Sequence, residues 1–173
     1  DILDTNGNVL VTNRASYDLV FNHYVILNAG DPNERLLELA LLCREKGIDL
    51  VITDHHECKE QLPQAVAVVD PHRADCTYPH QALSGVGVAF KLAAALLGDQ
   101  QEVLRRYADL VCLGTVADVM PLEGENRVFV SRGLDALRHT TRPGIAALMK
   151  ESNCDPASLS ASTVGYVLAP RIN

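Results

Sequence analysis

The stretch Leu50-Val51-Ile52-Thr53-Asp54-His55-His56-Glu57 joins an apolar run to one acid and two adjacent imidazoles. The run from Ile48 to Ile52 is typical of a strand buried on both faces of a parallel sheet. Ligands of such sheets bind at the carboxyl ends of the strands, and histidine is the commonest metal ligand near neutral pH. The stretch therefore predicts a metal or phosphate site at a strand end. A polar loop with two exposed histidines is the alternative.

The composition favours an α/β protein of ordinary size. The chain has 173 residues, which is enough for one domain with its own core. Apolar residues make up 47% and aromatic residues 5%, so the core is built from Leu, Val and Ala. The net charge of −7 argues against the strong basic patch of many nucleic-acid binders. It suits a site that collects divalent cations, and it equally suits an ordinary soluble protein.

The cysteines indicate a reducing compartment. Their number is odd and no C-x-x-C spacing occurs (Cys43, Cys58, Cys76, Cys112, Cys154). We therefore expect reduced thiols and an intracellular, cytoplasmic protein. No apolar stretch reaches the ~18 residues of a membrane span, and no signal peptide opens the chain. Because Asp1 is not a natural start and the chain stops just after a proline, we expect a fragment of a longer protein.

The residues before the opening stretch predict a strand, a helix and then the strand that ends at Asp54. Tyr24–Leu27 is an apolar run, residues 32–46 carry a helical apolar stripe, and Gly47 ends that helix. A right-handed βαβ crossover places the carboxyl ends of both strands at one edge of the sheet. Asn28 is therefore expected beside Asp54-His55-His56. A turn at residues 4–8 predicts a further strand from residue 9.

The remaining chain alternates between strand and helix signals. A strand is expected at 65–69, and helices at 84–97, 101–113, 126–138, 143–150 and 160–168. The predicted fold is α/β, with a mostly parallel sheet and helices on both faces. Ser84 can cap the second helix. Gly85 and Gly87 allow either close packing or a close approach of the backbone to an anion; both interpretations stay open.

Asp118 is a single carboxylate in the apolar stretch 114–122. Burying an unpaired carboxylate is costly. We therefore expect the Asp118 carboxylate to be hydrogen-bonded, paired or bound to a metal.

Together these stretches resemble the DHH phosphoesterase superfamily and, within it, the RecJ-like single-strand-specific exonucleases. Four blocks carry the resemblance in order: residues 51–56 (VITDHH), 83–90 (LSGVGVAF), 113–122 (LGTVADVMPL) and 168–173 (LAPRIN). The resemblance runs from about residue 27 to 173. It implies one DHH domain over 1–173, with 1–23 uncertain, that ends at the connector to an absent second domain.

The resemblance implies metal-dependent phosphodiester hydrolysis on single-stranded DNA in the 5′→3′ direction, as part of DNA repair and recombination. Two divalent ions, Mn²⁺ or Mg²⁺, activate a water and stabilise the leaving oxygen. His55 and Asp118 would ligate the same metal, His56 would contact the substrate phosphate, and Asp54 would orient the pair. By the same resemblance, Ser84, Gly85 and Gly87 would line the site and Arg171 would lie near the phosphate path.

The departures from the family pattern predict weak hydrolysis or none. Asn28 stands where the family has an Asp that bridges both metals. The family's first motif, D-x-D-G, has its nearest counterpart at Asp4-Thr5-Asn6-Gly7, although the spacing and the following strand-like run fit poorly. The alternative is a catalytically silent DHH domain that binds single-stranded DNA or a replication or repair protein as a scaffold. A third possibility, a DHH enzyme for other phosphate substrates, is less favoured by the RecJ-like blocks.

Overall fold

The computed structural model describes residues 2–3, 9–11 and 32–172, with backbone alone for 2–3, 9–11 and 32–36. The chain divides into a unit of residues 1–39 and a unit of residues 40–173. In the first unit, β1 (Ile2–Leu3) pairs antiparallel with β2 (Val9–Val11), which confirms the strand expected from residue 9. The expected strand Tyr24–Leu27 lies outside the described residues.

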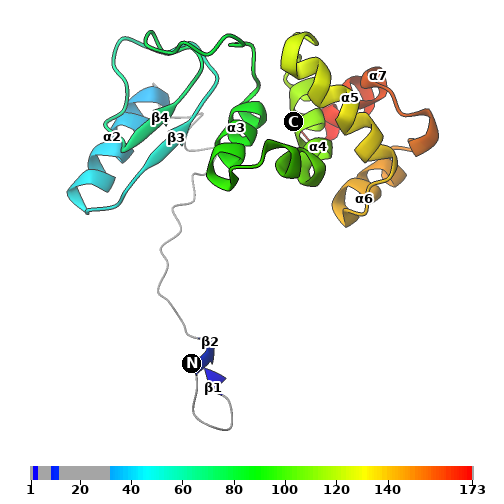
Figure 1. Ribbon diagram of the computed structural model, residues 1–173, viewed down its shortest axis with the longest axis horizontal. Helices are drawn as coiled ribbons and strands as arrows, with labels where there is room; N and C mark the ends of the chain where they lie inside the picture. Colours follow the sequence, from blue (N-terminus) through cyan, green and yellow to red (C-terminus); the bar gives the residue numbers. More distant parts are fainter. Residues whose placement is uncertain (1, 4–8, 12–31, 173) are drawn as a thin grey trace. The chain divides into compact units, whose positions relative to one another are not determined.

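The second unit contains a parallel strand pair and a set of helices (Figure 1). β3 (Val51–Thr53) pairs with β4 (Ala67–Val69), which confirms the predicted α/β class. The helices are α2 (Pro32–Glu45, which begins in the first unit), α3 (Gly85–Leu97), α4 (Gln100–Ala117), α5 (Gly124–Arg138), α6 (Pro143–Glu151) and α7 (Ala161–Thr163). A 3₁₀-helix η1 (Pro156–Ser158), a π-helix η2 (Val164–Leu168) and a 3₁₀-helix η3 (Ala169–Arg171) complete the chain. Within the described residues, no helix is long and apolar enough to cross a membrane.

β3 begins later than the apolar pattern predicts, and the cap of helix α2 takes the first residue of that pattern, Ile48. Gly47 adopts a left-handed φ of 66°. Its N–H donates to Arg44 and the N–H of Ile48 donates to Cys43, so both residues belong to the helix end. This is the Schellman arrangement that ends many helices, and glycine is its usual left-handed residue.

Helix α4 forms the centre of the helical part, because it packs against both α3 and α5 (Figure 1). A Cβ atom on Gly133 of α5 would overlap Cys112 and the carbonyl of Ala108 on α4. A Cβ on Gly114 of α4 would lie 2.5 Å from the side chain of Val86 on α3. The two glycines therefore allow the close approach on which this packing depends.

The prediction that α4 ends near residue 113 was wrong. The helix continues to Ala117, and Asp118 is its C-cap. Glycine disfavours a helix interior by about 1 kcal/mol relative to alanine, but the fit of Val86 against Gly114 outweighs this local preference. The longer helix carries Asp118 to the edge of the strand pair.

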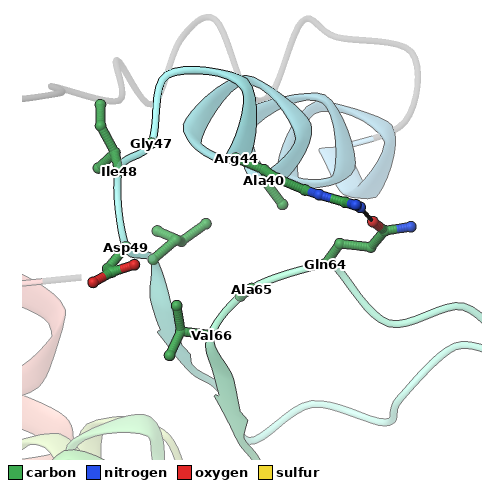
Figure 2. Close-up of a pocket in the computed structure, with 9 residues that line it drawn as sticks. Ala40, Arg44, Gly47, Ile48, Asp49, Gln64, Ala65 and Val66 are labelled. Carbon is green, nitrogen blue, oxygen red and sulfur yellow. Dashed lines mark hydrogen bonds between the residues drawn. The ribbon is translucent and has the colours of Figure 1, made fainter.

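A pocket of about 530 Å³ lies at the beginning of the two strands (Figure 2). Its lining includes the half-exposed Ile48, the exposed Val66, and a hydrogen bond from Arg44 to the side chain of Gln64. Leu50 and Val66, at the starts of the strands, belong to this lining, whereas Asp54 follows the other end of β3. The pocket is thus separate from the predicted metal or phosphate site.

Candidate metal and phosphate site

The strand end after β3 carries the predicted cluster. The N–H of Asp54 donates to the carbonyl of Val69 at 3.0 Å, which continues the pairing of β3 with β4 by one residue. Metal-ligating atoms of Asp54, His55 and His56 all lie within 4.8 Å of one another. The tripeptide is therefore held by the sheet itself.

Asp54 organises the two histidines. One of its carboxylate oxygens, Oδ1, accepts the backbone N–H of His55 at 2.7 Å and that of His56 at 3.3 Å, and it lies 2.7 Å from Nδ1 of His56. Burial would raise the pKa of the Asp54 carboxyl, but the His56 side chain and the two backbone N–H groups outweigh burial and lower that pKa. Asp54 is therefore an anion, and the folded chain supplies the hydrogen-bond donors that stabilise its carboxylate.

Nearby carboxylates raise the pKa of His56. The hydrogen bond with Asp54 raises the pKa of His56 against a smaller opposing effect of burial, and the charges of Asp54, Asp118 and Asp70 add to the rise. The side chain is 75% exposed. An exposed imidazole that is protonated more readily is suited to an anionic ligand such as a phosphate.

His55 meets Asp118 across the site. Its Nε2 lies 3.3 Å from Oδ2 of Asp118, and the side chains are 16% and 41% exposed respectively. Asp118 is partly exposed, because helix α4 continues to Ala117 and Asp118 caps its solvent-facing end. The expectation that its carboxylate has a partner is confirmed by His55.

The start of helix α3 lies behind the His55 ring. A Cβ on Gly85 would lie 3.3 Å from Cδ2 of His55, so the absence of a side chain leaves room for the imidazole. Ser84 caps the helix as predicted: its Oγ accepts the N–H of Gly87 at 3.3 Å and lies 3.2 Å from the Thr115 hydroxyl. Ser84 is only 1% exposed, so its hydroxyl serves the interior of the protein and does not face the site. Gly87 is also buried, which favours packing as its role.

The sequence interpretation overlooked Asp70 and His72. Asp70 follows β4 at the same edge, and its side chain is 3% exposed. Its carboxylate accepts the N–H of His72 at 2.8 Å and the thiol of Cys58 at 3.4 Å. The signal was present, because an acid directly after the neighbouring parallel strand occupies the same position as Asp54 after β3.

The remaining predicted site residues are Arg171, Asn28 and Asp4. Arg171 lies in η3 and donates to the carbonyl of Val167. Asn28 and Asp4 lie outside the described residues.

The chain is similar to several known proteins. The family model "DHH family, N-terminal domain" matches residues 6–115. The single-stranded-DNA-specific exonuclease RecJ of Bacillus subtilis (strain 168) is 48% identical over 134 residues, which cover 78% of this chain and 17% of that protein. RecJ of Escherichia coli (strain K12) is 41% identical over 143 residues, which cover 75% of this chain and 25% of that protein.

Two solved structures have the same fold. RecJ of Thermus thermophilus in complex with Mn²⁺ matches with a TM-score of 0.61 and 33% identity over 74% of this chain and 19% of that chain. An exonuclease RecJ bound to manganese matches with a TM-score of 0.67 and 32% identity over 81% of this chain and 35% of that chain. The chain thus spans a minor part of the length of these relatives. Because the family model covers more than half of the sequence, the chain belongs to the DHH family.

Proposed function

We propose that the chain is the core of a RecJ-like exonuclease domain that hydrolyses single-stranded DNA from the 5′ end with divalent metal ions. The observation that carries the proposal is the meeting of His55 and Asp118 at 3.3 Å beside the Asp54–His56 pair. The similar proteins that are named RecJ support the same substrate. The free cysteines of the structure support a cytoplasmic location.

The residues present fit a divalent ion. An imidazole and a carboxylate converge at His55 and Asp118, and both are ligand types that Mn²⁺ accepts. Three carboxylates (Asp54, Asp70 and Asp118) act on His56, so the cluster favours added positive charge. Manganese in the two similar solved structures supports this metal, with Mg²⁺ as the alternative. A second ion would require further ligands, for which Asn28 and Asp4 are the candidates from the sequence.

Each side chain then has a distinct task. His55 and Asp118 hold the ion, which when bound supplies Lewis acidity and a more acidic water. His56, whose pKa is raised by its hydrogen bond with Asp54, presents a ring N–H to the substrate phosphate. Asp54 fixes the ring of His56 and the turn that carries both histidines, so it is a positioning residue. Gly85 leaves the space in which the His55 ring sits.

Asn28 favours weak hydrolysis, and it motivates a second candidate function. A neutral amide cannot bridge two cations as the family's carboxylate does. The alternative is a catalytically silent domain that binds single-stranded DNA, or a replication or repair protein, without cutting.

Calorimetric titration with Mn²⁺ separates the two functions. Two sites of about micromolar affinity, both lost in His55→Ala, would support the enzyme. The exposed His139 is a matched control, and His139→Ala should bind Mn²⁺ like the parent chain. If the chain binds no Mn²⁺, or binds it at one weak site, the result would contradict the enzymatic function and support the catalytically silent domain.

A further inference from the structure

An apolar cavity lies beside Asp118, on the side formed by the end of α4 and the π-helix η2. Its volume is about 290 Å³, at the lower end of the roughly 300–1,000 Å³ typical of small-molecule sites. Ala117 and Val119, which flank Asp118 in sequence, belong to its lining, together with Met120 and Tyr166. The cavity is therefore adjacent to the proposed metal ligand and has the size for a single ring system.

Val119 is held in a conformation that its side chain disfavours. Its φ is 54°, and a β-branched residue at positive φ is a genuine outlier. Val119 and Met120 donate to the carbonyls of Val116 and Thr115, which makes a Schellman cap like the one at Gly47. The helix end at Asn153 has the same cap, with an asparagine at positive φ. Gly and Asn are the usual residues at this position, so Val119 introduces backbone strain. Val119 is also 87% exposed.

Tyr166 faces the same cavity from the π-helix. Tyr166 is 85% exposed. Short π-helical segments are frequent at functional sites. The neighbouring Gly165 allows close packing, since a Cβ there would lie 3.3 Å from Val116 of α4. An exposed aromatic ring and a strained exposed valine thus share one apolar cavity.

The lining of the cavity is mostly apolar, and it includes the exposed ring of Tyr166. A ligand that matches an exposed aromatic ring in an apolar cavity, close to the proposed metal ligand Asp118, has a planar ring and an anionic group. A nucleotide of a single strand has both, and bases stack on exposed aromatic rings without strict sequence preference.

The geometry points to a nucleobase platform formed by Tyr166 and Val119, which holds the base next to the phosphate at His55 and Asp118. This inference rests on the proposed function, because it assumes that single-stranded DNA is the substrate. The platform adds residues that would bind a base, whereas His55, His56 and Asp118 would contact the sugar–phosphate backbone of the DNA.

Fluorescence anisotropy with a labelled oligo-dT tests the platform. The oligomer carries phosphorothioate linkages to slow hydrolysis, and Mn²⁺ is present at low ionic strength. Tyr166→Ala should weaken binding on the order of tenfold, whereas Tyr166→Phe should bind like the parent chain. An abasic oligomer should bind the parent chain and Tyr166→Ala equally. Tyr107→Ala, which removes a half-exposed tyrosine of α4 outside the cavity, is the matched control and should not change affinity.

Val119→Gly gives a second test, which does not require that the Tyr166 variants fold correctly. Glycine relieves the positive φ, so the melting temperature should rise while the affinity for oligo-dT falls several-fold. Parent-like affinity in Tyr166→Ala or in Val119→Gly would overturn the platform and leave the proposed function intact. Failure of the parent chain itself to bind the oligomer would overturn the substrate assignment and the platform together.

Discussion

Nε2 of His55, which follows the end of β3, lies 3.3 Å from Oδ2 of Asp118, which caps the end of α4. The contact joins the strand pair to the helical part of the second unit. It is also half exposed on the Asp118 side, so its electrostatic contribution to stability is small. A pair at the surface that contributes little to folding is well placed to exchange its internal contact for a metal ion.

Asp118→Ala should therefore separate binding from folding. The free energy of unfolding should change by less than about 1 kcal/mol, because solvent screens this pair. Mn²⁺ affinity should fall by about tenfold or more, since a direct ligand is removed and even supporting residues are typically worth 10–100-fold. Urea denaturation and calorimetry measure the two quantities. A loss of several kcal/mol would identify Asp118 as a structural carboxylate instead.

Ser84→Ala should show the opposite pattern. Loss of the helix cap costs about 1 kcal/mol, and the buried Thr115 hydroxyl loses its 3.2 Å partner at a further cost. Urea denaturation should show this loss, and Mn²⁺ affinity should stay close to the parent value because the Ser84 hydroxyl does not face the site. Ser160→Ala removes an exposed cap of the short helix α7 and should cost less. Equal costs in both variants would contradict the buried role of Ser84.

The parts of the structure that could be predicted are those decided by local chemistry. The caps at Ser84 and Gly47 follow from what each residue does to its own helix end. The position of Asp54-His55-His56 follows from the general rule for parallel strand ends. These features need no knowledge of distant contacts.

The parts that could not be predicted depend on tertiary packing. Whether α4 continues past Gly114 is decided by Val86 of another helix, and the exposure of Asp118 follows from that extension. The positive φ of Val119 contradicts its local preference, so no local rule predicts it. The pairing of Ser84 with Thr115 likewise appears only when α3 packs on α4.

Gly133→Ala should test the close packing of α4 and α5. The added methyl group would overlap Cys112 and the Ala108 carbonyl, and overpacking of this kind typically costs about 1–3 kcal/mol. Gly144→Ala is the matched control, because a Cβ there meets no atom within 4 Å in helix α6. That variant should gain about 0.5–1 kcal/mol from helix propensity. Thermal melts of both variants should shift in opposite directions, and a neutral Gly133→Ala would show that the two helices can separate freely.

Acid should weaken the contact between α5 and the segment around Tyr78 and Lys91. Burial would raise the pKa of the Glu125 carboxyl, but its ion pair with Lys91 and the hydrogen bond from the Tyr78 hydroxyl outweigh burial and lower it below 4.5. A lowered folded-state pKa adds stability that is complete above the unfolded pKa and is lost as pH falls through the folded one. The parent chain should therefore lose more stability below about pH 4.5 than Glu125→Gln does, by at most about 1 kcal/mol after solvent screening.

Glu123→Gln is the control for this acid effect, because it removes an exposed charge near the same helix start. Its urea midpoints between pH 7 and pH 3 should fall in parallel with those of the parent chain. If the urea midpoints of Glu125→Gln also fall in parallel with those of the parent chain, then the contacts of Glu125 with Lys91 and Tyr78 contribute nothing to the loss of stability at low pH. The stability of the α5 start would then rest on the buried Asn126, whose side-chain amide donates to the carbonyls of Ala82 and Pro121 and does not titrate.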